Sequence, residues 1–290
     1  MSTVPPYLAL LLAGGLLAGT AARPDPEPEL GRVRWGRDVD TALAQSRASG
    51  RPVLVLFDEV PGCATCRQFG QVVLSHPLLA EAIEHEFVPV FVANNRPGRD
   101  AAALARFGEP AWNNPVVRLL APDGHDLVPR ADGLYTAHAI AERLIAGLHA
   151  AGRPVPGYLS IAEQEARTAH RREATFAMAC FWEGEARLGA LSGVLAVEAV
   201  QLGNAEGVRV EYDESELTRA ALVRAAAERA CTVQSAENAR ARPAGGSDHL
   251  HALAHSRYAR LALTPMQAMR VNAALAAGTD PTEWLAPSQR

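Results

Sequence analysis

The sequence contains no lysine, and all of its 28 basic residues are arginine. They are outnumbered by 32 acidic residues, which gives a formal net charge of -4. Proteins that bind nucleic acid usually carry an excess of basic residues, so this balance argues against a nucleic-acid partner. The exclusive use of arginine is typical of a GC-rich coding sequence. We therefore give clusters of arginine little functional weight.

Cysteine is also scarce, with four residues in a chain of 290. Small secreted domains that depend on disulfides carry a much higher proportion of cysteine. A chain of this length can instead bury two hydrophobic cores, so it does not need disulfides for stability. We interpret the cysteines as reactive groups rather than as structural cross-links.

Residues 1–22 differ in composition from the rest of the chain. The apolar run Tyr7–Leu17 is followed by small residues up to Ala22 and by a proline-rich segment, 23–30. This order is typical of a signal peptide, a cleavage site and a spacer, although no Lys or Arg precedes the run. The run is shorter than the roughly 20 residues of a membrane-spanning helix. We predict a periplasmic or secreted protein without a membrane anchor after cleavage. The alternative is a cytoplasmic protein with a disordered N-terminal tail.

The segment 31–159 alternates predicted helices and strands. Continuous apolar runs such as 52–57 are typical of strands that are buried on both faces. Asp123-Gly124 between two short apolar segments predicts a β-hairpin. In chain order we predict a helix ending at Ser49, a strand 52–57, helices 66–76 and 78–83, a strand 87–92, hairpin strands 116–120 and 126–128, and a helix 137–151.

The motif Cys63-Ala64-Thr65-Cys66 directly follows the first predicted strand. A CxxC pair at a strand-to-helix turn exchanges electrons readily, because the helix N-terminus stabilises the first thiolate. A structural metal site is the alternative, but it needs two further ligands, and the sequence has no second CxxC or CxxH. We therefore predict a redox-active pair, no metal and no cofactor.

The order of elements around this motif resembles the thioredoxin fold over nearly all of 31–159. The resemblance implies that Cys63 is the nucleophile and that Cys66 resolves the mixed disulfide. It also implies a cis-proline beside the pair, and Pro115, after Asn114, stands at that position. Ala64-Thr65 differs from the Gly-Pro of the reducing thioredoxins, so the direction of electron flow stays open.

The composition of residues 160–172 predicts a linker that becomes helical. We expect a second domain in residues 173–290. An apolar strand leads to Cys180, and a helix begins directly after it. Further along we predict half-buried strands 194–200 and 208–212, a helix 217–230, and a helix to Ala277 that starts with a capping box at Thr264-Pro265-Met266-Gln267. The predicted fold class is α/β, a thioredoxin-like domain followed by an α+β domain.

Five short segments of 173–290 share an order and spacing that resembles the A-type peptide methionine sulfoxide reductases. They are Cys180-Phe181-Trp182, Leu191–Val194, Ala205–Asp213, Gly246–His249 and Leu263–Gln267. The resemblance implies that Cys180 attacks the sulfoxide sulfur and that Glu206 protonates the sulfoxide oxygen. It also implies that Phe181 and Trp182 hold the substrate methyl group, and Asp248 matches a hydrogen-bonding residue near that site.

Sulfoxide reduction would suit these residue types chemically. The oxygen is a poor leaving group until it is protonated, so a partly buried carboxyl beside the thiol is required. Attack leaves Cys180 as a sulfenic acid, which condenses with a second thiol to a disulfide. Cys231 is the candidate resolving cysteine, with a buried core role as an equal alternative, and Cys63 is a second candidate.

We therefore predict an oxidoreductase that reduces methionine-S-sulfoxide in oxidised proteins or peptides. In this prediction the CxxC pair recycles Cys180, and an upstream thiol reductant supplies the electrons. Ala179 and Glu183 replace glycines of the family, and its two site tyrosines are absent. The main alternative is accordingly a thiol-disulfide oxidoreductase with a degenerate second domain. A third is an interaction module with inert cysteines. We interpret His249, His251 and His255 as solvated surface residues.

Overall fold

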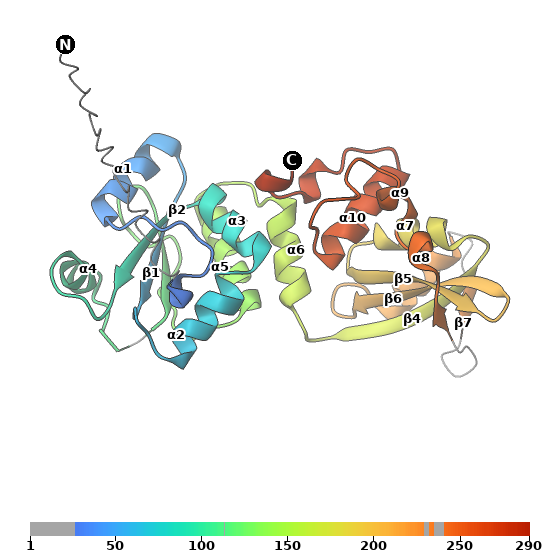
Figure 1. Cartoon of the computed structure of the whole chain (residues 1–290), viewed down its shortest axis with the longest axis horizontal. Coiled ribbons are helices and arrows are strands. Elements are labelled where there is room, and N and C mark those ends of the chain that lie inside the picture. The colour runs from blue at the N-terminus through green and yellow to red at the C-terminus, as the bar shows by residue number, and fades with distance from the viewer. Residues whose placement is uncertain (1–26, 113, 229–231, 235–240) are drawn as a thin grey trace, which may run out of the picture.

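The computed structural model describes residues 27–112, 114–228, 232–234 and 241–290. The predicted signal peptide, most of the predicted spacer and Cys231 lie outside these residues. Two α/β units lie side by side along the longest axis, and helix α6 (Gly157–Ala166) runs between them (Figure 1). Among the residues described, no helix is both long and apolar enough to cross a lipid bilayer.

The first unit is built on a three-stranded sheet in the order β2-β1-β3. Its strands are β1 (Val53–Asp58), β2 (Val88–Ala93), which is parallel to β1, and β3 (Val116–Leu120), which is antiparallel to it. Its helical segments are η1 (Pro28–Leu30), α1 (Val39–Ser49), α2 (Ala64–Gln68), η2 (Phe69–Val73), α3 (Pro77–Glu86), α4 (Arg99–Phe107) and α5 (Ala137–Ala150).

Strand β1 is buried on both faces, as its continuous apolar run predicts. Val53, Val55 and Phe57 belong to a core cluster with residues of α1 and α4. Leu54 and Leu56 belong to the main core with residues of α3 and α5. The alternation follows from the pleat of the strand, which sends successive side chains to opposite faces. Helices therefore cover both faces of the sheet and fix the position of the residues that follow β1.

The prediction of a β-hairpin after β3 is wrong in part. Beyond β3, the pairing is limited to an isolated bridge between Leu120 and Asp126, with backbone hydrogen bonds from Leu127 to Leu119 and from Ala121 to His125. Pro129 follows shortly afterwards, and proline cannot donate a ladder hydrogen bond. The predicted helices and the strands before β3 are present with small shifts at their ends.

The second unit contains a five-stranded sheet in the order β7-β4-β6-β5-β8. Its strands are β4 (Arg171–Met178), β5 (Val194–Leu202), β6 (Ala205–Asp213), β7 (Thr232–Gln234) and β8 (Arg242–Pro243). Its helical segments are α7 (Phe181–Gly189), α8 (Arg219–Ala227), η3 (Gly246–Asp248), α9 (His251–Ala254), α10 (Pro265–Ala276), η4 (Thr282–Trp284) and η5 (Pro287–Gln289).

Helices α7 and α10 pack against each other and against β5. The predicted capping box of α10 is confirmed. The Thr264 side chain accepts a hydrogen bond from the Gln267 backbone, and the Gln267 side chain accepts one from the Thr264 backbone. Both orphan donors at the start of the helix are thereby satisfied.

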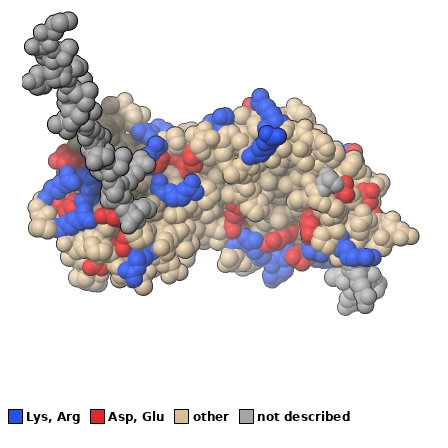
Figure 2. All heavy atoms as spheres, viewed as in Figure 1, with Lys and Arg blue, Asp and Glu red and all other residues tan. Residues whose placement is uncertain are grey.

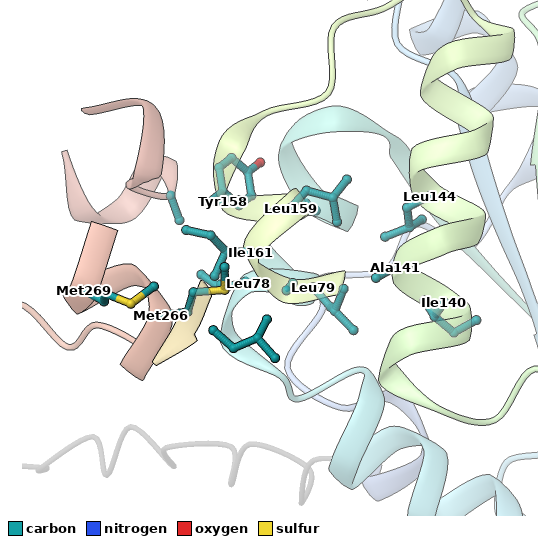
Figure 3. Close-up of a cluster of buried hydrophobic side chains, with 14 of the residues drawn as sticks. Leu78, Leu79, Ile140, Ala141, Leu144, Tyr158, Leu159, Ile161, Met266 and Met269 are labelled. Carbon is teal, nitrogen blue, oxygen red and sulfur yellow. The ribbon is translucent and has the colours of Figure 1, made fainter. Parts of the chain in front are cut away.

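Helix α6 contains the predicted boundary near residue 160 and joins the two units through a shared core. It packs against α3 and α5 of the first unit and against α10 of the second. Figure 3 shows the side chains that meet at this junction, among them Tyr158, Leu159 and Ile161 from α6 and Met266 and Met269 from α10. The hydrophobic core is therefore continuous from one unit to the other.

Acidic and arginine side chains are interspersed over the face of the molecule in Figure 2. Several form ion pairs across elements. At the end of α6, for example, Arg167 binds Glu163, Asp213 and Glu216. This network ties α6 to the end of β6 in the second unit.

Candidate functional site

The CxxC pair lies immediately after β1 at the start of α2. Cys63 is the N-cap residue of α2 and is exposed, whereas Cys66 is fully buried. The two sulfur atoms are 3.1 Å apart, and both thiols are free. One sulfur is therefore accessible to a substrate, and the second lies close enough to attack the first.

The surroundings of the two thiols shift their pKa values in opposite directions. The backbone N–H and the thiol of Cys66 interact with the Cys63 sulfur and lower the pKa of Cys63. Burial, followed by the neighbouring Cys63 and Asp58, raises the pKa of Cys66. Because the thiolate is the nucleophile, Cys63 is the residue prepared for the first attack.

Asp58 at the end of β1 is a site residue that we did not identify from the sequence. Its side chain is fully buried against the Cys66 thiol, and burial raises its pKa to about 7. A carboxyl group with this pKa can accept a proton near neutral pH. The sequence feature that indicates Asp58 is its position: an acidic residue at the end of an apolar strand, five positions before Cys63.

The predicted cis-proline is confirmed, because the Asn114-Pro115 bond is cis. Phe57 of β1 pairs with Val116 of β3, so Pro115 lies at the strand end opposite Asp58. Trp112 precedes it in the same loop and is 82% exposed. An exposed indole in this loop can provide an apolar contact for a polypeptide. We did not identify Trp112 from the sequence.

The last residues of the predicted spacer pack against the CxxC loop. Glu29 in η1 is buried, and its carboxylate accepts a hydrogen bond of 2.8 Å from the Gly62 backbone N–H. A Cβ atom at Gly62 would collide with the Glu59 carbonyl oxygen and lie 2.6 Å from Cys66 Cβ. The loop can therefore fold tightly only because residue 62 is glycine.

The second predicted site lies at the connection between the end of β4 and the start of α7. Cys180 is half-buried and is the N-cap residue of α7. The Phe181 backbone N–H donates a hydrogen bond of 2.8 Å to the Glu206 carboxylate. The pairing of Met178 with Glu206 in the β4–β6 ladder produces this contact. The structure thus places the Glu206 carboxylate at the start of α7, on the backbone of the residue that follows Cys180.

The aromatic residues after Cys180 have different surroundings. Phe181 is buried, while Trp182 is 41% exposed and forms an edge-to-face pair with it. The His251 ring stacks on Trp182 with centroids 3.9 Å apart. One face of the indole is therefore covered by a histidine instead of being open to a substrate methyl group.

The interpretation of the three histidines as solvated is wrong for His251, whereas His249 is exposed but hydrogen-bonded. His251 stacks on Trp182, and His249 makes a 2.6 Å contact through Nδ1 with the fully buried Glu185. The hydrogen bond to the Glu185 carboxylate raises the pKa of His249. Asp248 directly precedes His249 in η3 and is half-buried. These pairings connect α7 to the segment 248–251, a contact that spacing alone does not reveal.

The two cysteine sites are far from each other in the fold. Figure 1 shows α2 in one half of the molecule and α7 in the other, with α6 and α10 between them. Transfer of electrons from the CxxC pair to Cys180 therefore needs either two molecules or a change in the arrangement of the units.

Comparisons with known proteins concern the first unit. Residues 34–122 match a family described as thioredoxin-like. A thioredoxin from Thermus thermophilus, known from a solution structure, has 28% sequence identity, with a TM-score of 0.34, over 39% of this chain and 85% of that chain. No curated protein matches the chain.

The comparisons and the fold agree on the class of the protein. Residues 34–122 form a thioredoxin-like domain, and further α+β structure follows it. The family match ends at residue 122 and gives no support to a methionine sulfoxide reductase domain in 173–290. At a coarse level, the thioredoxin-like domain with its CxxC pair indicates a redox enzyme.

Proposed function

We propose that this protein is an oxidoreductase that exchanges thiols and disulfides with other proteins through Cys63 and Cys66. One observation carries the proposal: an exposed thiol with a lowered pKa lies 3.1 Å from a buried thiol with a raised pKa. This is the asymmetry that two-step disulfide exchange requires. The thioredoxin-like domain around the pair supports the same chemistry.

In the first step, the Cys63 thiolate attacks one sulfur of a substrate disulfide. The substrate S–S bond breaks, a mixed disulfide forms, and the leaving thiolate takes a proton from water. Trp112, exposed in the loop before Pro115, offers an apolar surface to the polypeptide around that disulfide.

In the second step, the Cys66 thiol gives its proton to the Asp58 carboxylate and attacks the Cys63 sulfur. The substrate leaves with its second thiol, and the chain keeps the Cys63–Cys66 disulfide. Two electrons have then passed from the chain to the substrate. An upstream thiol reductant returns the pair to the dithiol form.

A second candidate activity, reduction of methionine-S-sulfoxide at Cys180, is favoured by the Phe181–Glu206 hydrogen bond. In this reaction the Cys180 thiolate attacks the sulfoxide sulfur and Glu206 protonates the oxygen. The sulfide leaves, and Cys180 becomes a sulfenic acid. A second thiol then forms a disulfide with Cys180 and releases water. The substrate is an oxidised methionine in a protein or peptide.

The cellular location is part of the proposal. A periplasmic or secreted protein follows from the composition of residues 1–22, and an oxidising compartment contains the protein disulfides that Cys63 would attack.

Reduction of a protein disulfide by the dithiol form of the full chain tests the main proposal. We expect Cys63→Ser to slow the reaction by more than about 100-fold, because a serine hydroxyl does not ionise near neutral pH. Cys180→Ser is the matched control and should leave the rate unchanged. Equal rates for Cys63→Ser and the unmodified chain would contradict the proposal.

A further inference from the structure

A third potential ligand lies beside the two thiols and has no part in disulfide exchange. The sulfur atoms of Cys63 and Cys66 and a carboxylate oxygen of Glu59 all lie within 4.8 Å of one another. Glu59 and Cys63 lie in the loop that leads from β1 into α2, and Cys66 lies in α2. Such spacing suits three atoms that share one metal ion.

The donor set is chemically suited to zinc. Zn²⁺ binds thiolate sulfur and carboxylate oxygen and accepts three protein ligands with a fourth position open. From the sequence we predicted no metal, because no further Cys or His ligand stands at a suitable spacing. The structure supplies a carboxylate instead. Gly62 makes this possible, since a side chain there would collide with the Glu59 backbone and crowd Cys66.

Two further carboxyl groups lie beside the cluster. Asp58 is fully buried against Cys66, and among the described residues no nitrogen or oxygen donor reaches its Oδ2 atom. Glu29 is buried at Gly62. Two guanidinium groups bind the backbone of the same loop: Arg67 donates to the Gly62 carbonyl, and Arg96 donates to the Val60 carbonyl and to Glu27.

We propose that the reduced loop binds one Zn²⁺ ion through Cys63, Cys66 and Glu59, with the fourth position open to water. Binding displaces the thiol protons and forms two zinc–sulfur bonds. The disulfide form has no thiolate to offer, so only the dithiol form binds the ion. The zinc ion is then bound to the Cys63 sulfur, which would otherwise attack a substrate disulfide. The metal-bound form therefore does not exchange disulfides.

A titration of the reduced, metal-free chain under anaerobic conditions tests this site. Cys180→Ser and Cys231→Ser are introduced throughout, so that only the two loop thiols remain. Co²⁺ is the spectroscopic probe, and Zn²⁺ affinity is measured by competition with a chromophoric chelator. We expect one Co²⁺ per chain with thiolate-to-cobalt charge-transfer absorption, and no binding to the oxidised chain.

The contribution of Glu59 to zinc affinity distinguishes this site from a dithiol that binds zinc through its two sulfur atoms alone. We expect Glu59→Gln to weaken Zn²⁺ binding by about 10- to 100-fold. Glu27→Gln removes a nearby carboxylate outside the cluster and should leave the affinity unchanged. Near-ultraviolet circular dichroism establishes that each variant is folded. The proposal is overturned if folded Glu59→Gln binds Zn²⁺ as tightly as its parent, or if the parent binds no more tightly than dithiothreitol does.

Discussion

Replacement of Asp58 by asparagine is expected to stabilise the folded chain above pH 7 by up to about 4 kcal/mol. Burial raises the pKa of Asp58 from 3.8 to about 7, and each unit corresponds to about 1.4 kcal/mol. The raised pKa means that the folded state disfavours the ionised carboxylate. Asparagine keeps the shape of the side chain and an oxygen that can accept the Glu59 backbone N–H bond.

The sign of the pH dependence follows from the same shift. Below pH 3.8 the carboxyl group is protonated in both states and contributes no difference. As the pH rises toward 7, the unfolded chain loses this proton first, so the unmodified protein loses stability. Above pH 7 the folded state carries the full free-energy cost of the buried, ionised Asp58 carboxylate.

Chemical denaturation of the reduced protein at a series of pH values measures this effect. The difference in free energy of unfolding between Asp58→Asn and the unmodified chain should grow from pH 4 to pH 7 and then level off. A difference that stays constant over this range would contradict the assignment of Asp58 as a buried group with a raised pKa. Cys66 should also be deprotonated more slowly in the variant, since the proton acceptor is missing.

For the proposed sulfoxide reduction at Cys180, we expect no activity in Cys180→Ser and a rate lower by roughly 10²- to 10⁴-fold in Glu206→Gln, as for the loss of a general acid. The assay uses a peptide with methionine-S-sulfoxide and dithiothreitol as reductant. The glutamine oxygen can still accept the hydrogen bond from the Phe181 N–H. The variant therefore tests proton donation by Glu206 without removing this structural contact. Glu198→Gln is the matched control, because Glu198 forms an ion pair with Arg209 on the same sheet.

Two results would contradict the second activity. The first is an unreduced peptide in the presence of the unmodified chain while alkylation shows that Cys180 is free and reactive. The second is equal activity of Glu206→Gln and its parent. In either case the first site is unaffected, since disulfide exchange at Cys63 depends on neither residue.

Local signals in the sequence predicted much of the fold. Gly50 ends α1 in the left-handed conformation, the apolar run of β1 is buried throughout, and Thr264 starts α10 with a capping box. Each of these depends on residues within a few positions of one another. Helix α4 was not predicted, although Ala103, Leu104 and Phe107 form an apolar stripe at helical spacing that packs against the core.

The candidate sites were predictable only in part. Cys63, Cys66 and Pro115 belong to one recognisable order of elements, and regular strand pairing brings Glu206 to the Phe181 backbone after Cys180. The contact of Glu29 with Gly62 and the stacking of His251 on Trp182 join segments that are distant in the sequence. Such contacts depend on how the elements pack, and no local pattern encodes them.

The pH dependence of Cys63 alkylation tests the central claim most directly. The reduced chain is treated briefly with iodoacetamide at a series of pH values, and the modified peptides are identified by mass spectrometry. We predict that Cys63 reacts first and that its rate reaches half-maximum at a pH below the pKa of a free cysteine thiol measured in the same way. A half-maximum at or above that value, or faster modification of Cys66, would contradict the assignment of Cys63 as the attacking thiolate.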